Sequence, residues 1–145
     1  MMRRVQTLDL VPNDILKNID TNRDGKIDGY QFDLKNPFYT AEPIGAIKEL
    51  FITVDGKKVD PKKVTLTVRG QKIRLLNAPT IYEIPWASYE VISVFIEQAD
   101  GLKAGNHELE CTLHLTSTTT YGGELKDTEG TPYREYFTKV TMILT

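Results

Sequence analysis

The residues with the clearest chemical pattern lie between positions 20 and 31. They follow the spacing of an EF-hand calcium loop, with oxygen-bearing side chains at Asp20, Asn22, Asp24 and Asp28, a glycine at Gly25 and isoleucine at Ile27. The twelfth position of that loop is Gln31, whose amide cannot supply the charged bidentate carboxylate that closes such a site. A hairpin with Asp24 and Gly25 at its tip explains the same residues without an ion. We expect no metal on this chain, with a calcium loop as the alternative.

Histidine, cysteine and paired carboxylates are the other candidates for chemistry. Cys111 lies on the apolar side of an alternating run, which predicts a buried thiol with a raised pKa and not a nucleophile. His107 and His114 are seven positions apart, a spacing unfamiliar for metal ligands on a strand. Glu108 and Glu110 share a polar stripe of the kind that sheets show to water. We predict no catalytic and no cofactor-binding residue. A stand-alone hydrolase that uses the histidines and carboxylates is kept as a further alternative.

The charge balance and the apolar stretches exclude several classes of protein. The 145 residues carry 18 Lys and Arg against 20 Asp and Glu, a formal charge of −2, and no basic run that would bind phosphates. No apolar stretch is long enough to span a bilayer, and residues 5–9 interrupt any signal-peptide core. One cysteine cannot form an internal disulfide. We therefore expect a cytoplasmic protein with no nucleic-acid and no membrane partner.

Alternation of apolar and polar residues with period two predicts six strands. The runs cover residues 30–34, 50–54, 64–68, 92–96, 109–115 and 136–144. Turn residues such as Asp55-Gly56 and Asp100-Gly101 separate them, and no run fits a helix of ten or more residues. Strands with one apolar face need a second layer to cover that face. The sequence thus predicts an all-β fold, a two-layer antiparallel β-sandwich, as a single domain over residues 1–145.

Some segments depart from this pattern. Residues 1–13 are interpreted as an N-terminal extension, and the glycine-rich residues 117–132 as a mobile loop or an extended hairpin tip. Residues 36–45 combine two prolines with bulky apolar side chains, which suggests that something covers them. The single tryptophan is either a core plug or an interface anchor. Candidates for contact with a partner or a substrate entrance are Pro37, Phe38, Tyr39, Pro43, Ile44 and Trp86.

Several blocks of the sequence resemble a known family. They read DGKIDGYQF at 24–32, NPFY at 36–39, IKEL at 47–50, TVDGKKV at 53–59 and GLKAGNHEL at 101–109. In this order and spacing they resemble the small (β) subunit of bacterial C-glycoside deglycosidases, over about residues 14–116. Residues 117–132 have no counterpart in the resemblance.

The resemblance implies the non-catalytic subunit of a two-component lyase. Its larger, TIM-barrel-type α subunit would carry a divalent metal, Mn²⁺ or similar, and a histidine base. The complex would cleave the C–C bond between a 3-oxo sugar and an aromatic, flavonoid-type aglycone. The sequence itself leaves one rival from another class, a calcium-dependent carbohydrate-binding β-sandwich module built on residues 20–28.

Overall fold

The computed structural model describes residues 6–116 and 125–145, and nearly all regular structure within them is β. The strands are β1 (Ile15–Ile19), β2 (Gly29–Lys35), β3 (Glu42–Pro43), β4 (Ile47–Val54), β5 (Lys57–Lys58), β6 (Val64–Val68), β7 (Gln71–Arg74), β8 (Pro85–Trp86), β9 (Val91–Glu97), β10 (Gly105–Thr116), β11 (Leu125–Lys126) and β12 (Pro132–Leu144). Three short 3₁₀ helices, η1 (Ile44–Ala46), η2 (Pro61–Lys63) and η3 (Leu75–Thr80), are the helical elements of this part of the chain. The prediction of an all-β fold is confirmed, as are the six predicted strands.

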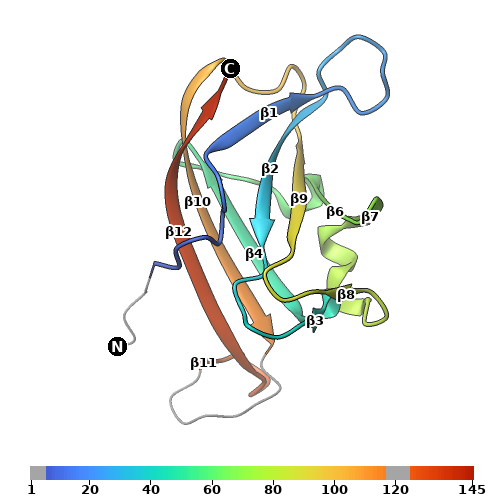
Figure 1. The fold of residues 1–145 in the computed structure, drawn as a ribbon, viewed down its shortest axis with the longest axis vertical. Coiled ribbons are helices and arrows are strands. Elements are labelled where there is room, and N and C mark those ends of the chain that lie inside the picture. Colours follow the sequence, from blue (N-terminus) through green and yellow to red (C-terminus); the bar gives the residue numbers. More distant parts are fainter. Residues whose placement is uncertain (1–5, 117–124) are drawn as a thin grey trace.

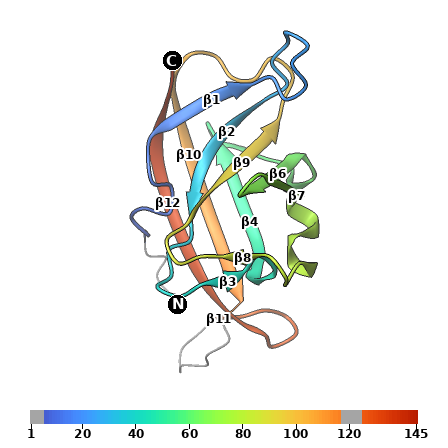
Figure 2. The same cartoon turned by 45° about the vertical axis from the view of Figure 1, so that its right-hand side comes forward.

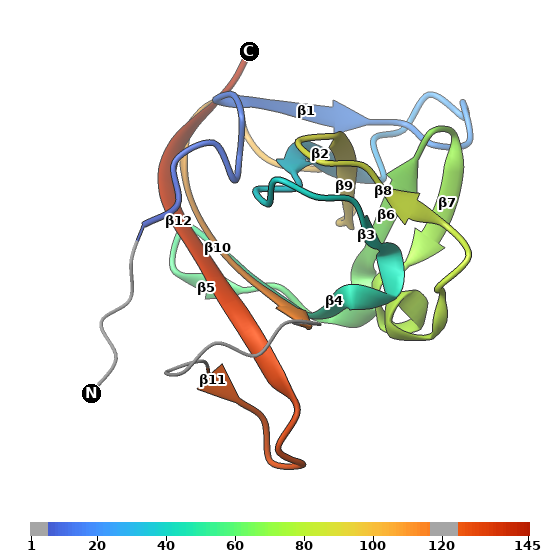
Figure 3. The same ribbon diagram turned by 60° about the horizontal axis from the view of Figure 1, so that its bottom comes forward.

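The two layers belong to one curled sheet. Its strand order is β5-β4-β10-β12-β1-β2-β9-β6-β7, with β11 paired to β12, and β3 and β8 form a separate small sheet. Strand β1 joins the layers, because its first residues pair in parallel with β12 and its later residues pair antiparallel with β2. Figures 1 and 3 show the β4–β10–β12 layer facing the β2–β9–β6 layer. The parallel β1–β12 pair is the departure from the antiparallel pairing that the sequence predicted.

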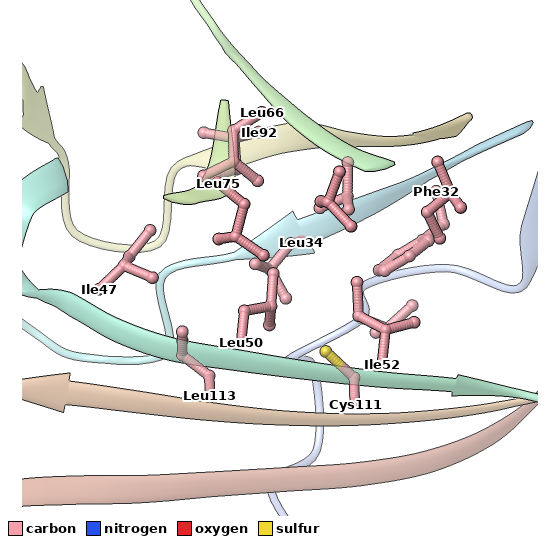
Figure 4. Close-up of a cluster of buried hydrophobic side chains, with 14 of the residues drawn as sticks. Phe32, Leu34, Ile47, Leu50, Ile52, Leu66, Leu75, Ile92, Cys111 and Leu113 are labelled. Atoms are coloured by element: carbon pink, nitrogen blue, oxygen red, sulfur yellow. The ribbon is translucent and has the colours of Figure 1, made fainter. Parts of the chain in front are cut away.

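The alternating pattern of each strand decides which side chains fill the space between the layers. Inward residues of β2, β4, β9 and β10 are buried, and Figure 4 shows them meeting between the ribbons. The labelled set is Phe32, Leu34, Ile47, Leu50, Ile52, Leu66, Leu75, Ile92, Cys111 and Leu113. Cys111 is 0% exposed, and burial raises the pKa of its thiol to about 12, so the prediction of an inert buried cysteine is confirmed.

Tight turns lie where the sequence predicted them. Asp55 and Gly56 join β4 to β5 with φ of 51° and 80°, the left-handed pair that a two-residue hairpin requires. Arg69 with Gly70 and Asp100 with Gly101 also have positive φ. The first two turns join strands that pair antiparallel, β4 with β5 and β6 with β7, whereas the third leads from β9 in one layer to β10 in the other.

The N-terminal segment 1–13 and the segment 117–132 are both partly described by the structure, and both are ordered there. In the N-terminal segment, Leu10 is 0% exposed and its carbonyl accepts a hydrogen bond from Lys35 N–H, so part of this extension belongs to the core. Residues 117–124 lie outside the described residues. After them, β11 pairs with β12 to form a hairpin, in which Asp127 accepts hydrogen bonds from Glu129 N–H and Thr131 N–H. No helix in the described ranges 6–116 and 125–145 is long and apolar enough to cross a membrane.

Candidate functional site

The segment after β2 is held in one conformation by a buried asparagine. Asn36 is 0% exposed, and its side-chain amide donates to the carbonyls of Thr40, Trp86 and Ala87 at 3.1–3.3 Å. Its Oδ1 accepts from Phe38 N–H at 2.9 Å. Every polar atom of this side chain is therefore used to fix the backbone of a proline-bearing segment that no long strand supports.

An arginine from β12 completes the surface over this segment. Arg134 Cζ lies 3.6 Å from the centroid of the Phe38 ring, and the rings of Phe38 and Tyr39 are 4.4 Å apart. Arg134 Nη2 donates to Glu42 Oε1 at 3.3 Å, and the Glu42 side chain is only 7% exposed. We call residues 36–43 together with Arg134 the 36–43 surface, in which the guanidinium of Arg134 stacks on the Phe38 ring. It lies at the end of the sandwich where Figure 1 shows β3 and β8.

The structure divides the six sequence-predicted candidates. Tyr39 is 68% exposed, and Pro37, Phe38 and Pro43 are half-buried in the 36–43 surface. Ile44 and Trp86 are 0% exposed, so they belong to the core and are not available for contact with another molecule. The reading of Trp86 as an interface anchor therefore does not hold, and the core-plug reading does: its indole N–H donates to the Glu90 carbonyl at 2.9 Å.

Arg134 and Glu42 were not predicted from the sequence. They are 92 positions apart, and only the fold brings β12 against the short strand β3. The Nε of Arg134 is buried and has no hydrogen-bond partner within the described residues. A buried N–H of a charged group that has no partner is costly, which makes this pair the polar feature of the surface that most needs an explanation.

The carboxylates of the calcium-like motif organise their own loop. Asp20 Oδ2 accepts from Gly25 N–H at 2.8 Å, and Asp28 accepts from the N–H and hydroxyl of Thr21. Asp24 Oδ1 accepts from Lys26 N–H at 2.8 Å. Among residues 6–116 and 125–145 the structure contains no group of three or more His, Cys, Asp or Glu side chains that could hold a metal ion. The motif forms a nine-residue loop between β1 and β2, which is longer than the hairpin turn that the sequence predicted.

Calcium is expected not to bind this loop. Isothermal titration of the full chain with calcium up to about 1 mM should give no saturable heat, because Gln31 leaves the site without its closing carboxylate. Magnesium under the same conditions is the matched control. A saturable calcium heat would instead support the calcium-dependent carbohydrate-binding alternative.

His107 bridges two turns and is not placed for catalysis. Its Nδ1 lies 2.6 Å from Asp55 Oδ2 and its Nε2 lies 2.6 Å from the Lys103 carbonyl. Both neighbours accept hydrogen bonds, so only the doubly protonated imidazolium can donate to both. These two contacts raise the pKa of His107, and the contact with His107 lowers the pKa of Asp55.

The His107 contacts predict a pH-dependent stability. Because the pKa of His107 in the folded chain lies above its ordinary value of 6.5, its contribution is fully present below about pH 6.5 and is lost as the pH rises through the folded-state pKa. We expect about 1 kcal/mol, since the Asp55 side chain is 46% exposed and water screens the pair. Urea unfolding of the wild type and of His107→Gln at pH 5.5 and above pH 8 measures it. The difference in unfolding free energy should shrink at the higher pH, and a constant difference would show that the neutral ring makes these contacts.

His114 lies on the outer face of the β4–β10–β12 layer. Its Nε2 is 2.9 Å from Glu135 Oε2, and its ring contacts Tyr133 at 4.5 Å and the edge of Phe51 at 5.4 Å. The structure does not bring His114 to His107, because they lie at different places along β10. The two histidines therefore do not form the composite site that the hydrolase hypothesis needs.

A groove of about 900 Å³ runs along β4 and is walled by η2 and η3. Its lining mixes apolar residues such as Leu75 and Leu76 with Lys48, Glu49 and Glu110. None of the six candidates lines it. The groove thus offers contact area without a set of converging reactive groups.

The fold and its surface define an all-β domain with an aromatic and arginine patch at one end, from which Tyr39 is 68% exposed. The family described as C-glycoside deglycosidase beta subunit matches residues 8–119, and the chain belongs to this family. It is 27% identical over 97 residues to the C-glycoside deglycosidase beta subunit of Eubacterium cellulosolvens, covering 67% of this chain and 66% of that protein. It is 31% identical over 87 residues to the 3'-dehydrocarminate deglycosidase beta subunit of a Microbacterium species, covering 60% and 65%. The matched part of the chain thus spans just under two thirds of each relative.

Proposed function

We propose that this chain is the non-catalytic β subunit of a heteromeric C-glycoside deglycosidase. The complex would cleave the C–C bond between a 3-oxo sugar and an aromatic, flavonoid-type aglycone. The observation that carries the proposal is the family match over residues 8–119, together with two relatives named as deglycosidase β subunits.

In this proposal the groups that react with the sugar lie on a partner subunit. A ketone at C3 of the sugar acidifies the hydrogen at C2, so a base must remove that proton and an electrophile must stabilise the enolate. In this proposal a larger, TIM-barrel-type α subunit supplies a divalent metal, Mn²⁺ or similar, and a histidine base. This chain would bind the larger subunit and form part of the wall of the substrate entrance. The complex would work in the cytoplasm.

The 36–43 surface is the part of this chain proposed to meet the larger subunit and to wall the substrate entrance. Asn36 fixes its backbone before any partner arrives, so little conformational entropy is lost when the surface is buried. Tyr39 and the Arg134 guanidinium are of the residue types that dominate binding energy at interfaces. A planar aglycone would also stack on such rings.

Co-expression of this chain with the proposed larger α subunit tests the proposal. Size-exclusion chromatography should show both chains in one peak, and that peak should contain a divalent metal and release the aglycone from a 3-oxo C-glycoside. This chain purified alone should release none. Separate elution of the two chains, or aglycone release by this chain alone, would overturn the proposal.

A further inference from the structure

A buried aromatic residue lies at each end of the sandwich, and the two residues differ in their hydrogen bonding. At the β3–β8 end, the indole N–H of Trp86 donates to a backbone carbonyl. Figure 2 shows the opposite end, where β4 and β9 finish and β2 begins. Tyr30, the second residue of β2, is only 2% exposed. Within the described part of the chain the Tyr30 hydroxyl has no hydrogen-bond partner. The oxygen is also not fully buried, because the buried side-chain polar atom left unpaired in the described residues is Arg134 Nε, so the Tyr30 hydroxyl reaches solvent and can serve a ligand.

Tyr30 lines a pocket of about 410 Å³ at this end, between the start of β2, the end of β9 and the β4–η2 segment. Burial and the nearby Asp55 carboxylate raise the pKa of Tyr30 to about 12. The hydroxyl therefore keeps its proton over the whole physiological range and can donate. The volume lies within the range of small-molecule sites and accommodates a single six-membered ring with its substituents.

The remaining lining combines donors, acceptors and apolar surface. Three lysines, Lys57, Lys58 and Lys63, face three carboxylates, Asp55, Asp60 and Glu97, so the formal charge of the lining is zero. The Asp55 carboxylate already accepts from His107 and from Glu108 N–H, and Asp60 accepts from Lys62 N–H, whereas the Glu97 carboxylate accepts no hydrogen bond within the described residues and is the most available carboxylate. The side chains of Val54, Ile96 and Leu102 supply the apolar part of the lining.

This combination selects among ligand classes. An inorganic anion needs donors alone and a metal cation needs acceptors alone, whereas the hydroxyl groups of a sugar both donate and accept. A pyranose ring also has an apolar C–H face that packs on aliphatic side chains. We propose that the pocket binds a neutral pyranose, with Tyr30 donating to a ring hydroxyl, Glu97 accepting from another, and the lysines at the rim. This site needs no partner subunit and goes beyond the proposed function.

The test is a titration of the ¹⁵N-labelled full chain with methyl β-D-glucopyranoside, followed by amide chemical shifts. Saturable shifts are expected at Val54, Lys57, Ile96 and Leu102, with a dissociation constant in the millimolar range typical of one small ligand. Tyr30→Phe should raise that constant about fivefold. It should leave the melting temperature unchanged, because the lost hydroxyl has no partner in the described part of the protein. Tyr82→Phe, outside both this pocket and the 36–43 surface and 66% exposed, should change neither value.

Three results would overturn the proposal. The first is the absence of saturable shifts at about 50 mM glucoside, far above any useful millimolar affinity. The second is that inorganic phosphate shifts the same amides and the glucoside does not, which would make the pocket an anion site. The third is a glucoside affinity that Tyr30→Phe leaves unchanged, which would place the sugar elsewhere. Because the titration uses this chain alone, its failure leaves the proposed function untouched.

Discussion

Replacing Trp86 with alanine is expected to lower the free energy of unfolding by about 3–5 kcal/mol. Trp86 is 0% exposed and closes the β3–β8 end of the sandwich, so its removal leaves a cavity that the short strands around it cannot fill. The Glu90 carbonyl also loses the indole donor, although Asn36 N–H still bonds to it. Urea unfolding monitored by far-ultraviolet circular dichroism measures the change. Since a domain of this size has about 5–15 kcal/mol of stability, the variant should be close to unfolding at 37 °C.

Trp86→Phe is the matched control for the cavity. It keeps an aromatic ring and loses only the indole donor and part of the volume, so it should cost less than half as much. If Trp86→Ala cost less than about 1.5 kcal/mol, the assignment of this residue to the core would be wrong. If the phenylalanine variant were as unstable as the alanine variant, the indole hydrogen bond would be the larger contribution.

Tyr39→Ala is expected to weaken binding between the two subunits of the proposed complex by tenfold or more, and turnover at fixed subunit concentration should fall with it. The side chain is 68% exposed in this chain and its ring contacts the neighbouring Phe38 ring, so its loss should change the stability of the fold little. Titration of the larger subunit with this chain, with aglycone release as the signal, measures the effect. The melting temperature should move by no more than about 2 °C.

Phe51→Ala provides the comparison for Tyr39→Ala. Phe51 is 52% exposed on the outer face of β4, away from the 36–43 surface, and the same substitution there should leave subunit affinity unchanged. Equal losses from both variants would show that the partner does not select the 36–43 surface. Unchanged affinity and turnover for Tyr39→Ala would remove this surface from the proposed interface.

The strands and core were predictable because alternation is a local property of the sequence. Cys111 is an example: its place between polar neighbours was enough to predict a buried thiol, and it is 0% exposed. Trp86 and Ile44 were harder, because a large apolar residue beside a proline has the same pattern whether its own chain or a partner covers it. In the folded structure the chain itself buries both of them.

The polar details of the surface were not predictable. The contact between Arg134 and Glu42 joins residues 92 positions apart, and no local pattern marks either one. The parallel pairing of β1 with β12 is a similar case, since strand period indicates which face is buried and not which strand lies alongside. The family resemblance supplied what periodicity could not, and the match over residues 8–119 confirms it.

The position of β1 has a consequence for how the chain acquires its structure. Ile15 and Leu16 are aligned with Ile143 and Leu144, so the contact that joins the two halves of the sheet links regions at nearly the largest possible sequence separation. Closing such a long loop costs entropy before any contact compensates for it. All-β proteins with many distant pairings fold over milliseconds to seconds. We therefore expect slow refolding that is completed only when the final strand docks, and a nascent chain still lacking that strand would display two unpaired sheet edges to its surroundings.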